Sequence, residues 1–146
     1  NSLMRPLIIL ALETAMRRGE LLSMCWQDFD EARCVIHLPK TKNGHARTVP
    51  LTREAVRVLK SLPRSDERIL PISANASAAR VGSSTPQGSV PDLRLHDLRH
   101  EAISRLVERG FSLAQVQQVS GHRSLQMLMR YTHLAVDDIV RALHAG

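Results

Sequence analysis

Aromatic residues are scarce in this sequence, where two Phe, one Trp and one Tyr make up 3% of the chain. Proteins that hold single-stranded nucleic acid by base stacking need several aromatic rings, so the sequence disfavours stacking as the main mode of binding. Positive charge is plentiful, because 20 Lys and Arg against 14 Asp and Glu give a net charge of +6. This balance favours a polyanionic partner, such as a nucleic-acid duplex contacted through its phosphates. Charge alone would equally suit a basic domain without such a partner.

Cysteine is nearly absent, since Cys25 and Cys34 are the only two. They are too few for a disulfide framework and lack the paired spacing of a zinc ribbon, so we expect reduced, structural thiols. No uninterrupted apolar run approaches the roughly 20 residues that span a bilayer, and no charged leader opens the chain. These absences predict a cytoplasmic protein without a membrane partner. An apolar segment follows Asn1 almost at once, so we expect further sequence to precede it.

Hydrophobic periodicity predicts the elements of the first half of the chain. Residues 7–12 are apolar on every side, which predicts a buried helix. Residues 35–38 have the composition of a strand, the Asn-Gly pair at 43–44 is a strong hairpin signal, and residues 46–51 supply a returning strand. We therefore predict an α+β fold, mainly helical, with a small antiparallel sheet of two or three strands near residues 33–51.

Capping residues predict the helices of the second half. Thr52 begins a helix that Pro63 stops, and a helix resumes at about Asp97 and ends at Gly110. Residues 73–91 are rich in Ala, Ser, Gly and Pro, which predicts a mobile loop.

Two shorter helices complete the predicted fold. Ser112 and Gln115 form a capping box for a helix that Gly121 ends. Residues 135–146 are expected to form a final helix with an apolar face made of Val136, Ile139, Val140 and Leu143.

Arg17 is the first candidate site residue, because it follows directly on the predicted buried helix. A rigid helix would hold its side chain in place. Glu20 is three residues further on and could orient or pair with the guanidinium. The two residues could equally form an ordinary surface ion pair.

Lys42 is the second candidate, at the mouth of the predicted hairpin. A lysine there can move over a bound phosphate and donate a proton, which an arginine does poorly. Lys40 and Arg47 are nearby alternatives for that role.

The densest cluster of reactive side chains lies at residues 96–100. At the start of the predicted helix, His96 and Arg99 would share one face and could grip a phosphate. His96 and His100 also resemble half of a zinc site. However, Asp97 stands where the catalytic zinc motif needs Glu, and Arg99 would repel a cation, so no metal is predicted. A polar helix cap is the remaining alternative.

His122 and Tyr131 indicate little when each is taken alone. His122 lies between two predicted helices, where a histidine is ordinarily a turn residue, and a lone tyrosine usually packs against a core. Together with the upstream candidates they form a set suited to hold one phosphate against a phenol: Arg17, Lys42, His96, Arg99, His122 and Tyr131.

In order and spacing, these motifs resemble the catalytic domain of the tyrosine recombinase (phage integrase) family over residues 7–134. The family's first box, Thr-Gly-x-Arg-x-x-Glu-Leu, corresponds to residues 14–21, and its Trp-x-Asp-apolar-Asp pattern corresponds to residues 26–30. The family's hairpin lysine falls on Lys42. The remaining boxes match later positions, with His-x-x-Arg on His96 and Arg99, Gly-His on Gly121 and His122, and the nucleophile on Tyr131. Each match is weak alone, but six in sequence make a specific pattern.

Four features depart from the family pattern. Ala15 replaces the usual Gly, Ser120 stands where Leu commonly precedes Gly-His, and Leu128 occupies a position often held by Thr. Residues 73–91 lack the basic, helical pattern expected there. None of these departures removes a reacting group.

The resemblance implies cleavage and religation of double-stranded DNA without metal, cofactor or ATP. Tyr131 would attack a scissile phosphate, form a 3′-phosphotyrosyl link and free a 5′-hydroxyl. The resemblance also implies roles for the other residues: charge neutralisation by Arg17 and Arg99, general base for His96, hydrogen-bond donation by His122, protonation of the 5′-oxygen by Lys42, and support of the site by Glu20.

The resemblance further implies a tetramer on DNA and a separate N-terminal DNA-clamping domain. Residues 1–146 would then be a single catalytic domain, as the C-terminal fragment of a longer recombinase. The helix at 135–146 could be exchanged between protomers or pack in cis. Two other functions stay open: a DNA-binding module of this fold that does not cleave, and a DNA-relaxing enzyme resembling type IB topoisomerases.

Overall fold

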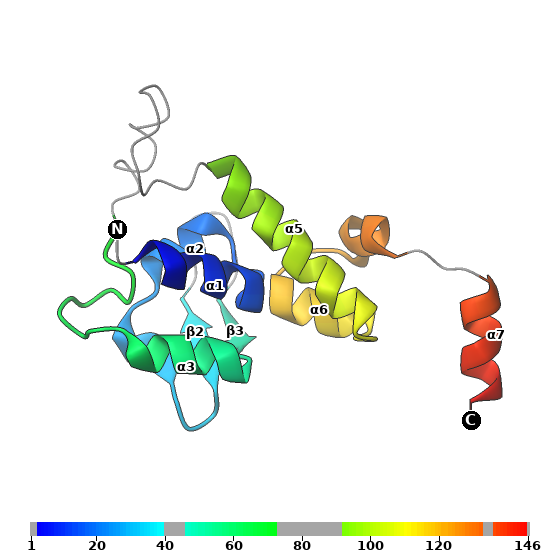
Figure 1. Ribbon diagram of the computed structural model, residues 1–146, viewed down its shortest axis with the longest axis horizontal. Helices are drawn as coiled ribbons and strands as arrows, with labels where there is room; N and C mark the ends of the chain where they lie inside the picture. The colour runs from blue at the N-terminus through cyan, green and yellow to red at the C-terminus, as the bar shows by residue number, and fades with distance from the viewer. Residues whose placement is uncertain (1–2, 40–45, 73–91, 133–135, 146) are drawn as a thin grey trace.

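The protein is described by a computed structural model, shown in Figure 1, which covers residues 3–39, 46–72, 92–132 and 136–145. The predicted loop at 73–91 and the predicted turn at 43–44 lie outside the described residues.

Helix α1 (Met4–Thr14) forms the centre of the structure. Its buried residues Leu7, Leu10, Ala11 and Thr14 have the spacing of a single helix face. This helix packs against α3 (Arg53–Ser61) and α5 (Asp92–Glu108). The predicted buried helix is thus confirmed, although only one of its faces is fully buried.

A three-stranded antiparallel sheet has the order β1 (Phe29–Asp30), β2 (Val35–Leu38) and β3 (Arg47–Pro50). Val35 pairs with Pro50 and Leu38 pairs with Arg47, so the predicted hairpin pairing is confirmed. The third strand, β1, lies before the predicted range of 33–51. A strand of two residues is too short to show the alternation by which strands are recognised in a sequence.

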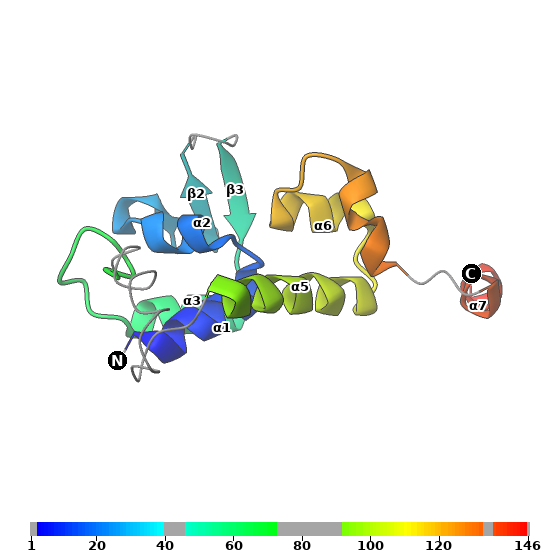
Figure 2. The same ribbon diagram turned by 90° about the horizontal axis from the view of Figure 1, so that it is seen from above.

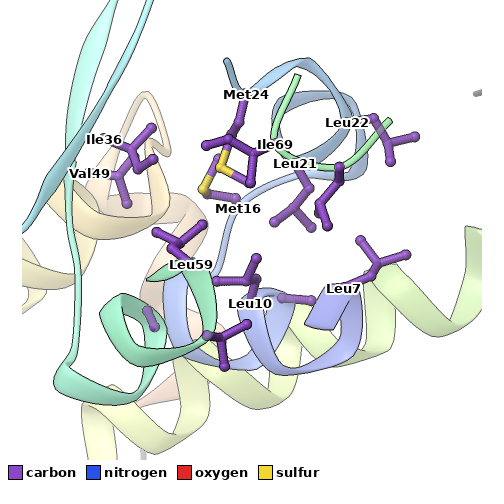
Figure 3. Close-up of a cluster of buried hydrophobic side chains, with 14 of the residues drawn as sticks. Leu7, Leu10, Met16, Leu21, Leu22, Met24, Ile36, Val49, Leu59 and Ile69 are labelled. Atoms are coloured by element: carbon purple, nitrogen blue, oxygen red, sulfur yellow. The ribbon is translucent and has the colours of Figure 1, made fainter. Parts of the chain in front are cut away.

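The first hydrophobic core lies between α1, α2 (Arg18–Ser23), the sheet and α3. The short 3-10 helix η1 (Trp26–Asp28) leads from α2 into β1. Figure 3 shows this core, where side chains from separate elements meet: Leu7 and Leu10 of α1, Met16, Leu21, Leu22, Met24, Ile36 of β2, Val49 of β3, Leu59 of α3, and Ile69.

Helix α3 begins as predicted, because the Thr52 hydroxyl accepts a hydrogen bond from the Ala55 N–H at 3.1 Å. Helix α5 begins at Asp92 rather than at about Asp97. Leu95 is buried, so the apolar face of this helix starts earlier than the sequence pattern indicated. His96 and Arg99 therefore lie inside the helix and not at its start.

The second half of the structure comprises α5, α6 (Leu113–Ser120) and the 3-10 helix η2 (Leu125–Tyr131). The predicted capping box of Ser112 and Gln115 is present, and Gly121 ends α6 with a φ of 76°. A second, smaller core forms here from Ala15, Ala102, Ile103, Val116 and Leu128. Ala15 comes from the end of α1, so it connects the two halves.

Helix α7 (Val136–His144) is set apart from the other helices in Figures 1 and 2. Its apolar residues Val136, Ile139, Val140 and Leu143 are exposed. The predicted fold class, mainly helical with a small antiparallel sheet, is confirmed.

Candidate active site

The turn between α1 and α2 places Arg17. The Thr14 hydroxyl donates to the Leu10 carbonyl at 2.6 Å and accepts from the Met16 N–H at 3.2 Å. Ala15 between them has a left-handed backbone with a φ of 56°, which redirects the chain. Arg17 then occupies the N-cap position of α2, with its side chain exposed. A buried helix end is therefore followed at once by an exposed guanidinium.

Glu20 supports this turn, but its side-chain partner differs from the predicted one. Its carboxylate accepts the backbone N–H of Arg17 at 2.9 Å. It also accepts two hydrogen bonds from Arg47, from Nη2 at 2.7 Å and from Nε at 3.2 Å. Burial alone would raise the pKa of Glu20, but the hydrogen bonds from Arg47 and Arg17 outweigh it and lower the pKa. Glu20 therefore pairs with the guanidinium of Arg47 and with the main chain of Arg17.

Arg47 joins the two halves of the structure. Its Nη1 donates to the Val119 carbonyl at 2.6 Å, near the end of α6. Figure 2 shows β3 and α6 side by side where this contact forms. Because its guanidinium is held from both sides, Arg47 is unsuited to the mobile acid role for which it was an alternative. Lys42 and Lys40 lie outside the described residues.

Among the described residues of the candidate site, Arg99 is the most deeply buried charged one, with 5% of its surface exposed. Its Nη1 donates to the Ala15 carbonyl, and its Nη2 lies 3.4 Å from Nδ1 of His122. Burial first, and then the charge of Arg17, lower the pKa of Arg99 to about 10, so it remains a cation at neutral pH. Arg99 thus brings together the turn that carries Arg17 and the turn that carries His122.

His122 is held as a neutral imidazole. Burial, followed by the charges of Arg99 and Arg17, lowers its pKa to about 4. Nδ1 faces the Arg99 guanidinium, which can only donate, and lies 2.7 Å from the Ser120 hydroxyl. Nδ1 is therefore the acceptor nitrogen, and Nε2 carries the proton and is a donor. Ser120, which departs from the family pattern, orients this ring.

Tyr131 is the last residue of η2 and packs against the second core. Its hydroxyl forms a hydrogen bond with Nδ1 of His100, one helical turn after His96 on α5. Burial raises the pKa of the Tyr131 phenol, although Arg130 and Arg99 oppose the effect. The nucleophile predicted from the sequence therefore has an imidazole partner within the described structure.

His96 is exposed, and its ring meets the edge of His100 at a centroid distance of 4.4 Å. The Tyr131 phenol forms its hydrogen bond with His100, while the base role predicted for His96 stays a prediction. In the sequence, His100 belongs to the densest cluster of reactive side chains, where it was considered only as half of a zinc site. The feature that could have indicated its role is its position next to Arg99 and one helical turn after His96.

The described residues contain no cluster of three or more His, Cys, Asp or Glu side chains that could bind a metal ion. Within the same part of the chain, no helix is long and apolar enough to span a membrane. The described site contains two guanidinium groups, a neutral imidazole donor and a phenol, which are groups that can bind a phosphate diester and attack it.

Comparison with known proteins places this arrangement in a family. Residues 3–137 match the sequence profile of the phage integrase family. The chain belongs to that family. The matched range contains all six predicted site residues and confirms the resemblance inferred from their order.

Similar proteins agree with this membership. A shufflon-specific DNA recombinase of Escherichia coli is 42% identical over 147 residues, covering 99% of this phage integrase family chain and 38% of that protein. The integrase of transposon Tn1549, solved with circular intermediate DNA, has a TM-score of 0.68 at 19% identity, and the match covers 96% of this chain and 58% of the integrase chain in that structure. The catalytic domain of bacteriophage HP1 integrase has a TM-score of 0.66 at 24% identity, and the match covers 95% of this chain and 79% of the HP1 domain. These two structures share the fold.

Proposed function

We propose that this chain cleaves and rejoins double-stranded DNA at specific sites through a 3′-phosphotyrosyl intermediate. The position of Arg99 supports the proposal most directly. Its buried guanidinium contacts the Ala15 carbonyl, two residues before Arg17, and His122, while the next residue on α5 contacts the Tyr131 phenol. Groups from three distant parts of the sequence thus lie where they could surround one phosphate.

The roles follow from the chemistry of each group. Arg17 and Arg99 would neutralise the charge that builds on the non-bridging oxygens, a contribution of about 3 to 4 kcal/mol for each preorganised donor. The Nε2–H of His122 would donate a further hydrogen bond, and exposed His96 would contact a phosphate oxygen. Lys42 would protonate the departing 5′-oxygen. Because the phosphotyrosyl link conserves the energy of the broken bond, rejoining would require no ATP.

We propose that residues 1–146 are the catalytic part of a longer protein. The chain spans 38% of the length of the recombinase to which it is 42% identical. A separate N-terminal domain would then clamp the DNA. This chain alone would bind DNA weakly, and its affinity would fall steeply with added salt because its contacts are mainly to phosphates.

Self-association on DNA, as a tetramer, is the second part of the proposal. The apolar face of α7 (Val136, Ile139, Val140 and Leu143) is exposed, and contiguous exposed apolar patches mark interaction sites. We propose that a neighbouring protomer covers it. Light scattering of DNA complexes should show fewer copies when residues after Leu134 are removed or when Ile139 is replaced by Asp. Asp137→Asn is the control on an exposed polar position, and unchanged assembly of the truncated protein would indicate packing in cis.

The central test is covalent capture on DNA. The probe is a pool of nicked duplexes with a randomised centre, in which cleavage releases a short strand and traps the adduct. The wild-type protein should form a denaturant-stable adduct, and sequencing of the captured DNA would define the site. Tyr131→Phe should form none. Tyr131 is the only tyrosine in the chain, so this substitution leaves no alternative phenol. An adduct with Tyr131→Phe would rule out the assigned nucleophile.

The role of Lys42 can be tested separately with a duplex whose scissile 5′-oxygen is replaced by sulfur. A thiolate leaves without protonation, so this substrate should restore cleavage by Lys42→Ala. Lys40→Ala is the matched control, and it should cleave both substrates as the wild-type protein does. If Lys40→Ala alone were rescued by the sulfur substrate, the acid would be Lys40.

Two competing functions predict different results in the same assays. A DNA-binding module without activity would shift duplex mobility and form no adduct. An enzyme resembling type IB topoisomerases would relax a supercoiled plasmid that lacks the captured sequence, whereas a site-specific recombinase would not.

A further inference from the structure

The second histidine of the cluster at 96–100 is positioned to act on the nucleophile. His100 lies on the same turn of α5 as Arg99, and its Nδ1 forms a hydrogen bond with the hydroxyl of Tyr131. The two rings lie 5.7 Å apart between centroids, at an interplanar angle of 34°. The contact joins residues that are 31 positions apart and belong to different elements. It is made by the reacting oxygen itself.

We propose that His100 accepts the phenolic proton of Tyr131 during attack on DNA, which rests on the cleavage activity proposed above. In this step the O–H proton moves to Nδ1 as the phenolic oxygen forms a bond with phosphorus. The bond from phosphorus to the 5′-oxygen breaks, and that oxygen takes a proton from Lys42. In religation the steps reverse, and His100 returns its proton to the departing phenol.

The protonation states suit this transfer. Burial first, and then the electrostatic effects of His96, Arg130 and Arg99, lower the pKa of His100, while Asp97 opposes the effect. The ring is therefore uncharged at neutral pH and has a lone pair for the phenolic hydrogen. Because burial raises the pKa of Tyr131, the phenol keeps its proton until the phosphate arrives.

The surroundings of His100 show which other groups could affect its charge. Three come from α5 itself, namely His96, Asp97 and Arg99. Arg130 and Tyr131 face it from η2, and the charge of His100 is also felt by His122 in the turn after α6. Most of these groups are basic, so protonation of His100 is disfavoured in the free protein. A bound phosphate would reduce that penalty at the moment when His100 must take a proton.

Packing alone could also explain a tyrosine beside a histidine, because buried tyrosine hydroxyls usually find a partner. The structure separates the two roles. Tyr131 packs against the second core, which would hold its ring without His100. A packing role therefore predicts little loss of cleavage when the imidazole is replaced by another side chain that fills the space.

Two substitutions distinguish the roles. His100→Phe keeps a ring but removes the acceptor, and His100→Gln keeps an acceptor that cannot take a proton. Both should lower single-turnover cleavage of the captured duplex by about 10² to 10⁴-fold, the usual contribution of a general base. We expect the wild-type rate to fall at acidic pH as His100 becomes protonated below its ordinary pKa of 6.5, and both substitutions should remove that fall. His37→Ala, at the exposed position of β2, is the control for loss of a histidine and should cleave normally.

Fluorotyrosine provides the decisive comparison, since Tyr131 is the only tyrosine and is labelled alone. A more acidic phenol needs less help from a base, so fluorination should restore much of the rate of His100→Gln and change the wild-type rate little. Equal effects in both proteins, or cleavage by His100→Gln within threefold of wild type, would overturn the proposal.

The same label tests the contact without DNA. The fluorine resonance of wild-type protein should shift as His100 becomes protonated below pH 6.5. The shift should vanish in His100→Phe and persist in His37→Ala. A shift that persists in His100→Phe would contradict the contact. If the wild-type protein showed this shift but formed no adduct with any duplex, the cleavage activity itself would be wrong, and the proton transfer with it.

Discussion

Gly121 lies directly against the guanidinium of Arg47. A Cβ atom at position 121 would be 2.6 Å from Nε and 2.7 Å from Cζ of Arg47, which is closer than such atoms approach. The guanidinium cannot easily move, because Glu20 and the Val119 carbonyl hold it. The residue before His122 must therefore lack a side chain for the two halves of the structure to meet.

Gly121→Ala should destabilise the protein by about 2 to 3 kcal/mol, because it adds a collision with Arg47 to the backbone strain of about 1 to 2 kcal/mol. Gly110→Ala is the matched control, since Gly110 has a φ of 90° but nothing within 4 Å of its Cβ position. It should show the backbone strain alone. The measurement is urea unfolding of both variants. Equal losses would mean that Arg47 adapts without cost, contrary to its fixed position.

Glu20→Gln should destabilise the protein by about 2 to 3 kcal/mol, because it leaves the largely buried guanidinium of Arg47 without its counter-charge. The control is Glu54→Gln, which removes an ion pair with Arg57 on the exposed face of α3 and should cause no measurable change. The pKa of Glu20 is lowered on folding, so its contribution is present above pH 4.5 and is lost as pH falls through the lower folded value. The free energy of unfolding of the wild-type protein should therefore decrease as pH falls below 4.5, and this decrease should be smaller in Glu20→Gln.

His122 should make stability depend on mildly acidic pH. Its pKa falls from 6.5 in the unfolded chain to about 4 in the folded protein, so the unfolded state binds a proton first. The free energy of unfolding should therefore decrease as pH falls from 6.5 to 4, by about 1 to 2 kcal/mol after allowance for partial exposure of the ring. Histidine NMR titration measures the pKa directly, and His122→Asn should remove this part of the dependence. A pKa near 6.5 in the folded protein would contradict the neutral donor assigned here.

The elements that local sequence patterns could predict are those with a clear period or cap. The buried face of α1, the strand β2 and the Ser112 cap depend on residues within a few positions of one another. The early start of α5 was missed because Leu95 is buried by contacts with the first core, which come from the other half of the chain.

Motif order predicted which residues matter, but not how they contact one another. Arg47 reaches Glu20 across 27 positions, and Arg99 reaches the Ala15 carbonyl across 84. These contacts depend on a left-handed residue at the end of α1 and on the rotation of α5, which no local pattern encodes. For the same reason the sequence favoured His96 as the partner of the phenol, whereas the helix turns His100 toward Tyr131.

The last prediction concerns the left-handed backbone that shapes the Arg17 turn. Ala15 and Cys34 both have a φ of 56°, but Ala15 is buried and Cys34 is exposed. Cys34→Gly should stabilise the protein by about 1 kcal/mol, because glycine adopts this conformation without strain. Ala15→Gly gains the same relief but loses a buried methyl group worth about 0.8 kcal/mol, so its net effect should be close to zero.

Ala55→Gly is the control for these two variants, because it removes a buried methyl group from α3 without relieving any strain. It should destabilise the protein by about 2 kcal/mol, from the lost methyl and the lower helix propensity of glycine. Urea unfolding midpoints at constant slope give all three values. If Ala15→Gly stabilised the protein as much as Cys34→Gly, the Ala15 methyl would contribute nothing to the second core. Alanine in place of the glycine that the family usually has at position 15 would then lower the free energy of unfolding without any compensating contact.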